Sequence, residues 1–66
     1  MVTIKIKNII DAESWCIKHI GVRLYFIHTK FGGREWEIRK NNGHHTLTIH
    51  DEKKALLAIL KFGDQL

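Results

Sequence analysis

The sequence predicts a small α+β domain: a two-layer sandwich in the order βαβββα, with an antiparallel sheet and two helices on one of its faces. Three observations support this class. The chain begins with alternating apolar and polar residues, its middle contains two turn signals, and two segments carry apolar residues at helical spacing. We expect residues 1–66 to form a single domain, because 66 residues can build only one small core.

The first strand and the first helix are expected between residues 2 and 20. Val2, Ile4 and Ile6 alternate with polar residues, which indicates a half-buried strand. Asp11 is a favourable N-cap for the helix, and Gly21 is expected to end the helix as its C′ residue. The side of this helix expected to face the sheet carries Trp15, Cys16, His19 and Ile20, and the side expected in water carries Glu13 and Lys18.

Residues 21–50 are expected to form an antiparallel three-stranded meander, the scaffold of the sheet. The dipeptides Gly32-Gly33 and Asn42-Gly43 tolerate the positive φ angles that two-residue type I′ turns require. Turns at these positions place apolar residues of all three strands on one face. The resulting pairs are Thr29 with Trp36, Ile27 with Ile38, Ile38 with Leu47, and Trp36 with Ile49. The predicted core face contains Tyr25, Ile27, Trp36, Ile38, Leu47 and Ile49.

A second helix is expected after Asp51, which is a favourable N-cap. Gly63 is expected to end this helix, with Lys61 in its last turn. Its predicted apolar stripe contains Ala55, Leu56, Ile59 and Leu60. Because each helix has one apolar side, both are expected to cover the same face of the sheet and to leave the other face open.

The open face of the sheet is the predicted binding surface. Its expected residues are Phe26, His28, Lys30, Glu35, Glu37 and Arg39. Phe26 among polar groups would be an anchor for a partner, since aromatic and Arg side chains dominate interfaces. His28 is expected to pair with Glu37 on the neighbouring strand. Further contacts to phosphate groups or to an acidic partner are expected from Lys40, Lys53 and Lys54.

Composition favours acidic partners and an intracellular, cytoplasmic protein. The chain has 11 Lys and Arg against 7 Asp and Glu, a net charge of +4, but these charges are spread along the chain and are equally consistent with a salt-bridged surface. A single Cys excludes an internal disulfide. The start MVTIKIKN alternates instead of forming a signal-peptide core, and no apolar run is long enough to cross a bilayer. We therefore expect no membrane partner.

Five histidines raise the question of a metal or acid-base site, above all His44 and His45 beside the second turn. Adjacent strand residues point to opposite faces, and the register places His45 on the helix-covered side. The two histidines therefore cannot both join Cys16 and His19 around a metal, and their spacing matches neither common zinc pattern. The chain also lacks a phosphate-binding Gly-rich loop. We expect no metal, no cofactor and no catalytic site.

Two segments resemble families that act on RNA. A helix, a meander and a helix over residues 11–62, with Lys53-Lys54-Ala55 opening the last helix, resemble the double-stranded RNA-binding domain. That resemblance implies lysine contacts to phosphates at the helix start. Residues 39–45, RKNNGHH, resemble the Gly-Ser-His segment of the HicA-type toxins, which are small mRNA-cleaving proteins on a related fold. That resemblance implies a ribonuclease using His44 or His45.

Together these observations lead us to expect a small, basic, non-catalytic binding module. It would be an accessory, regulatory or inhibitor protein of the kind that phages and mobile elements encode, docking on a larger protein or nucleoprotein. Direct nucleic-acid binding is the alternative, and a small HicA-like ribonuclease is a more distant one. The sequence also leaves a homodimer open.

Overall fold

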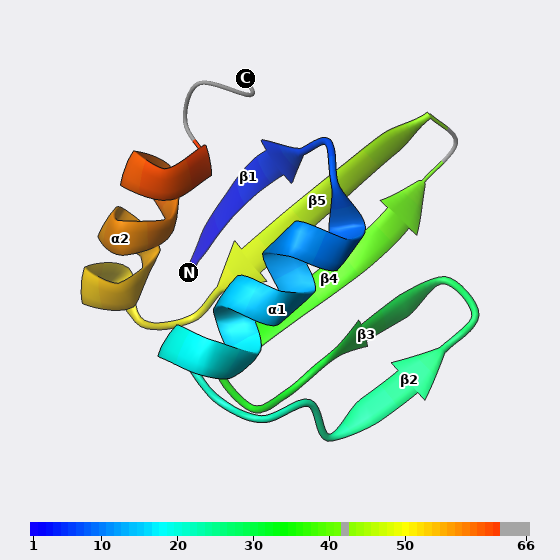
Figure 1. Cartoon of the computed structure of the whole chain (residues 1–66), viewed down its shortest axis with the longest axis horizontal. Helices are drawn as coiled ribbons and strands as arrows, with labels where there is room; N and C mark the ends of the chain where they lie inside the picture. The colour runs from blue at the N-terminus through cyan, green and yellow to red at the C-terminus, as the bar shows by residue number, and fades with distance from the viewer. Residues whose placement is uncertain (42, 63–66) are drawn as a thin grey trace.

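The computed structural model describes residues 1–41 and 43–62. In chain order the elements are β1 (Val2–Ile6), α1 (Ile9–His19), β2 (Tyr25–Ile27), β3 (Lys30–Gly32), β4 (Trp36–Asn41), β5 (His44–Ile49) and α2 (Glu52–Phe62). The strands of this described part form one five-stranded antiparallel sheet in the order β1-β5-β4-β3-β2. Figure 1 shows α1 lying across the sheet and α2 beside β1. The predicted α+β class is confirmed, with one more strand than expected.

The N-terminal strand forms as predicted and pairs with the last strand of the sheet. Ile4 and Ile6 of β1 are buried in the core, while Thr3 and Lys5, which alternate with them, are exposed. Ile4 lies opposite Leu47 of β5. The last strand in the sequence is therefore the neighbour of the first, and β1 forms one edge of the sheet.

The first predicted turn is wrong. β2 and β3 are joined by a turn at residues 28 and 29, where Ile27 pairs with Lys30, so residues 21–50 contain four strands in place of three. The glycines serve another purpose. A Cβ on Gly32 would lie 2.3 Å from the backbone oxygen of Trp36, and one on Gly33 would lie 2.2 Å from that of Val22. The glycine pair thus marks a close approach of backbones.

This shift moves the side chains of the 25–27 segment to the opposite faces from those predicted, because successive strand residues alternate. Phe31, not Ile27, lies opposite Ile38, and Ile27 is 51% exposed. Tyr25 lies in the open-face row with Glu37, and Phe26 stacks on the buried Phe31 on the helix side. The predicted core places of Tyr25 and Ile27, and the predicted open-face place of Phe26, are therefore wrong.

The second predicted hairpin is confirmed. Ile38 pairs with Leu47 and Trp36 with Ile49, and all four side chains are buried. Gly43 has a φ of 73°, which glycine adopts readily because it has no Cβ. The other residue of this turn, at position 42, lies outside the described residues.

Helix α1 begins earlier than predicted. The side chain of Asn8 accepts a hydrogen bond of 3.1 Å from the backbone N–H of Asp11, so Asn8 is the N-cap and Asp11 lies in the first turn. The predicted core contacts are confirmed for Cys16 and Ile20, which are buried, and Trp15 packs partly buried against the core. Two side chains differ from expectation: His19 is exposed, and Glu13 is half-buried beside Arg23 at 3.1 Å.

Helix α2 begins as predicted but is rotated about its axis. Asp51 accepts hydrogen bonds from the N–H groups of Lys53 and Lys54 at 2.8 and 3.2 Å, which confirms it as the N-cap. The helix buries Ala55, Ala58 and Phe62, whereas the predicted core residues Leu56 and Leu60 are exposed. Two alanines let the helix approach β1 and β5 closely, and Phe62 meets Trp15 edge-on at 5.6 Å. The predicted end at Gly63 lies outside the described residues.

We expect Trp36→Ala to lower the free energy of unfolding by about 3 to 5 kcal/mol, since it empties the largest fully buried site. That loss is comparable to the whole stability of so small a domain. Leu60→Ala is the matched control, because Leu60 is 83% exposed and should cost less than about 0.5 kcal/mol. Urea denaturation followed by circular dichroism measures both. Equal losses in the two variants would contradict the observed packing.

Candidate functional site

The face of the sheet opposite the helices consists of two cross-strand rows, which we call the open face. One row contains Lys5, Thr46, Arg39, Lys30 and Ile27, on β1, β5, β4, β3 and β2. The other contains Thr3, Thr48, Glu37, Gly32 and Tyr25. A shallow hollow of about 550 Å³ lies over β1, β5 and β4, and Thr46, Thr48 and Arg39 are among its lining residues. The surface is polar and broad.

A chain of three polar side chains organises the centre of the open face. The Tyr25 hydroxyl donates a 2.5 Å hydrogen bond to Oε1 of Glu37, and Nε of Arg39 donates one of 2.6 Å to Oε2. The hydrogen bond from Tyr25, followed by that from Arg39, lowers the pKa of Glu37. Partial burial and the same bond to Glu37 raise the pKa of Tyr25 to about 12. Glu37 is therefore held as a carboxylate whose lone pairs point at protein donors.

The open face carries a surplus of positive charge. Among the described residues of its two rows, Lys5, Lys30 and Arg39 face a single carboxylate, that of Glu37. Arg39 and Glu37 form an ion pair, and Lys5 and Lys30 form none within the described part of the chain. The two lysines are thus available to an anion. Arg39 also keeps N–H donors beyond the one it gives to Glu37.

The structure brings together half of the predicted binding residues. Lys30, Glu37 and Arg39 lie side by side on the open face. Phe26 lies on the helix side, and His28 lies in the turn between β2 and β3. The predicted pair of His28 and Glu37 is wrong. Gly32 lies opposite Glu37, and the Glu37 carboxylate accepts a hydrogen bond from the Tyr25 hydroxyl.

Lys40 also lies on the helix side. Its ammonium group is 5.3 Å from the ring centre of Phe26 and 5.5 Å from that of Phe31. Such a position over aromatic faces stabilises the cation locally. The charge of Lys40 is therefore directed toward β2 and β3, away from the open face.

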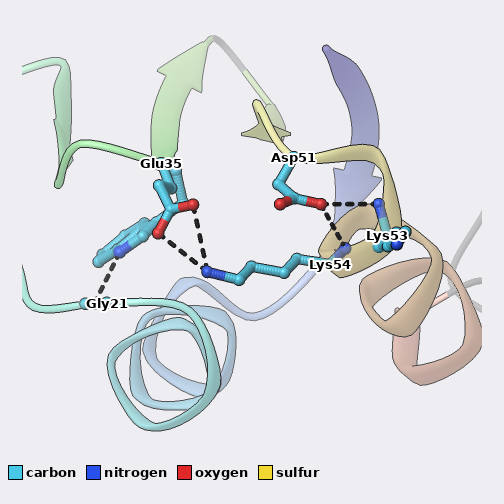
Figure 2. Close-up of polar contacts among 6 residues, drawn as sticks. Gly21, Glu35, Asp51, Lys53 and Lys54 are labelled. Carbon is cyan, nitrogen blue, oxygen red and sulfur yellow. Dashed lines mark hydrogen bonds and ion pairs between the residues drawn. The ribbon is translucent and has the colours of Figure 1, made fainter.

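The sixth predicted binding residue, Glu35, and the predicted phosphate contacts at the start of α2 form a structural tie. Figure 2 shows the Lys54 ammonium group between both carboxylate oxygens of Glu35, at 3.0 and 3.1 Å. The same figure shows Asp51 capping the backbone of α2. Glu35 and Lys54 thus join the loop before β4 to the helix, which leaves Lys53 as the exposed lysine of the pair.

The two adjacent histidines are separated by the sheet. His45 stands in the row of Ile6 and Lys40 on the helix side, as predicted, and its Nδ1 atom is buried without a hydrogen-bond partner among the described residues. His44 pairs with Asn41 and points to the other side. His44 and His45 therefore do not lie where they could act together as general base and general acid on one substrate.

The part of the chain that the structure describes contains neither a group of side chains placed to bind a metal nor an exposed thiol. No group of three or more His, Cys, Asp or Glu side chains in residues 1–41 and 43–62 is placed to hold a metal ion. Cys16 is buried in the core, and burial raises the pKa of its thiol to about 12. Its thiol is therefore protonated and packs in the hydrophobic core.

Sequence reasoning missed Lys5 and Tyr25 as members of the binding surface. The signal for Lys5 was present, since its position between Ile4 and Ile6 assigns it to the uncovered side of its strand. The pairing of β1 with β5 was needed to bring it into line with Arg39. Tyr25 required the correct register of β2.

Comparison of the chain with protein-family models, with curated proteins and with solved structures finds no match. Within the described residues, neither helix has the length and apolar character needed to cross a membrane. Any functional assignment therefore depends on the geometry and charge of the surfaces described above.

Tyr25→Phe is expected to lower the free energy of unfolding by about 1 kcal/mol at pH 7, because the Glu37 carboxylate loses a donor. The folded-state pKa of Glu37 is lowered, so its ionised form contributes stability above its ordinary pKa of 4.5, and that contribution is lost as pH falls through the folded value. Urea denaturation from neutral to acidic pH should show the two stability curves converging at low pH. A difference that stays constant at all pH values would contradict the assigned hydrogen bond.

Proposed function

We propose that the chain is a non-catalytic binding module whose open face holds the backbone of a single-stranded nucleic acid. One observation carries this proposal: Lys5, Arg39 and Lys30 stand in a single row across the sheet, with Thr46 between the first two. A row of cations on an uncovered face is suited to a partner that carries repeated negative charge.

The dimensions of the row fit several phosphates. Neighbouring strands lie about 4.8 Å apart, so the three steps from Lys5 on β1 to Lys30 on β3 span about 14 Å. Lysine side chains are long and flexible and can follow phosphates of varying position. The hydroxyl groups of Thr46 and Thr48 add donors and acceptors of the kind that contact phosphate and sugar.

The shape of the surface favours a single strand over a duplex. An extended strand can lie along a broad sheet face, whereas reading a duplex groove requires an element that enters the groove. The open face has one aromatic residue, Tyr25, and its hydroxyl is already bonded to Glu37. Binding would therefore depend mainly on phosphate contacts, with little sequence preference.

The same geometry weakens the case for docking on a protein through this face. Protein interfaces depend on large apolar or aromatic anchors in desolvated positions. Phe26, the anchor expected from the sequence, stacks on Phe31 on the helix side. Apart from Ile27 at its β2 end, the open face offers charge and hydroxyl groups, which favours the polyanion.

Replacing Lys5 and Lys30 by glutamine together should weaken binding of a fluorescently labelled short single-stranded RNA and make it less sensitive to salt. Each lysine lost from a phosphate contact should reduce the slope of log affinity against log salt by about 0.7, and the double variant should lose about 1.4. Fluorescence anisotropy between about 50 and 200 mM salt measures both quantities. Circular dichroism melting should show the fold unchanged, since both side chains project from the open face.

Lys53→Gln is the matched control. It removes one lysine charge, half of that lost in the double variant, from the exposed start of α2, and the Asp51 cap is kept because the capping bond uses the backbone of Lys53. This variant should retain the affinity and the salt slope of the wild type. Loss of binding in Lys53→Gln with binding kept in the double variant would move the site to the helix, and no binding by the wild type at low salt would remove the proposal.

A further inference from the structure

Two rows of different chemistry lie side by side on the open face. The cationic row is formed by Lys5, Arg39 and Lys30. The neighbouring row, which we call the hydroxyl row, is formed on the same face by Thr3, Thr48 and Glu37. Same-face residues on one strand are two positions apart, a step of about 6.8 Å. The open face therefore presents cations and, one step away, neutral hydroxyl groups with a carboxylate.

The hydroxyl row has acceptors left for a ligand. The Thr3 and Thr48 hydroxyl oxygens lie 3.0 Å apart, and their hydrogen bond uses a single proton and a single lone pair of the pair. Glu37 accepts one hydrogen bond from Tyr25 and one from Arg39, whereas a carboxylate has about four acceptor positions. A hydrogen-bond donor on the ligand would thus find partners in this row.

The hollow of about 550 Å³ on the open face joins the two rows. Arg39 and Thr46 line it on the cationic side, and Thr3, Thr48 and Glu37 line it on the other. The side chains of Thr46 and Thr48 are half-buried, so both hydroxyl groups have restricted positions. A ligand whose anionic group meets Arg39 therefore turns the adjoining part of its structure toward the hydroxyl row.

We infer that the open face selects RNA over DNA, with the hydroxyl row accepting a hydrogen bond from the ribose 2′-hydroxyl group and Thr48 determining this specificity. The inference rests on the proposed function, which places the phosphates on the cationic row. Each phosphate of a nucleic-acid strand is joined to a sugar, so sugars then lie beside that row. The 2′-hydroxyl group is a hydrogen-bond donor that RNA has and DNA lacks.

The charge of Glu37 makes the hydroxyl row unfavourable to DNA. Hydrogen bonds from Tyr25 and Arg39 hold Glu37 as a carboxylate, and a carboxylate repels a phosphate. The phosphates are thus kept on the cationic row, and the sugars face the acceptors. A deoxyribose offers only C–H groups there and leaves those acceptors without partners, which costs affinity.

The binding of three labelled single-stranded oligomers of equal length tests the selectivity: oligouridine, its 2′-deoxy form and its 2′-O-methyl form. Fluorescence anisotropy at one salt concentration should show oligouridine binding about three- to tenfold more tightly than either modified form, the ratio that one neutral hydrogen bond provides. The 2′-O-methyl form keeps the oxygen and lacks its proton, so it isolates the donated hydrogen bond.

The outcomes separate this inference from the proposed function. An affinity for oligouridine equal to that for either modified form would overturn the selectivity and leave the cationic row as the binding site. Absence of binding by all three oligomers at low salt would remove the proposed function and the selectivity together.

Substitution of Thr48 locates the selectivity within the open face. Thr48→Val should lower the affinity for oligouridine more than that for its 2′-deoxy form and bring the two close together, whereas Thr48→Ser keeps a hydroxyl group and should retain the preference. Thr46→Val is the matched control, because it makes the same change in line with the cations and should weaken both oligomers to the same extent. Circular dichroism melting checks the fold of each variant. A preference lost in Thr46→Val and kept in Thr48→Val would overturn the role of the hydroxyl row.

Discussion

The buried indole of Trp36 is the contact on which the rest of the structure depends. Its Nε1–H donates a 2.8 Å hydrogen bond to the carbonyl of Gly21, which ties the end of α1 to the centre of the sheet (Figure 2). The ring also meets Phe31 edge-on, with 6.4 Å between ring centres. The backbone of Trp36 passes so close to Gly32 that no larger residue fits there. One residue, through its side chain and its backbone, thus fixes the helix, the bend before β4 and the packing of β3.

The open face follows from this one-sided packing. Both helices bury apolar residues against the side of the sheet that carries Trp36, so neither helix covers the other side. The pairing of Leu47 with Ile4 and with Ile38 aligns the core row across β1, β5 and β4. Because side chains alternate, the same register aligns Lys5, Thr46 and Arg39 on the far side. The cationic row is thus the reverse side of the hydrophobic core.

Sequence reasoning succeeded where a local signal and the tertiary fold agree. The alternation in β1, the Gly43 turn and the Asp51 cap are each determined by neighbouring residues, and each formed as predicted. The sequence failed where two local readings compete. Gly32-Gly33 suits either a turn or a close backbone approach, and only the contact with Trp36 decides between them.

The orientation of helix α2 also could not be predicted from local sequence. Apolar residues occupy more than one side of it, and a stripe through Leu56 and Leu60 looks as good in sequence as one through Ala58 and Phe62. The narrow space beside β1 and β5 selects the small alanines, and the leucines turn outward. For the candidate site, the types of residue were predictable, but their alignment required the strand order β1-β5-β4-β3.

Binding of a nucleic-acid strand to the open face, as we propose, can be tested by mapping the contact by NMR. Amide chemical shifts of the labelled protein would be followed while a short single-stranded RNA is added. We expect the largest changes at Lys5, Thr46, Arg39 and Lys30, which lie on four strands but in one row. Changes concentrated at the start of α2 or around His44 and His45, or no changes at low salt, would contradict the proposal.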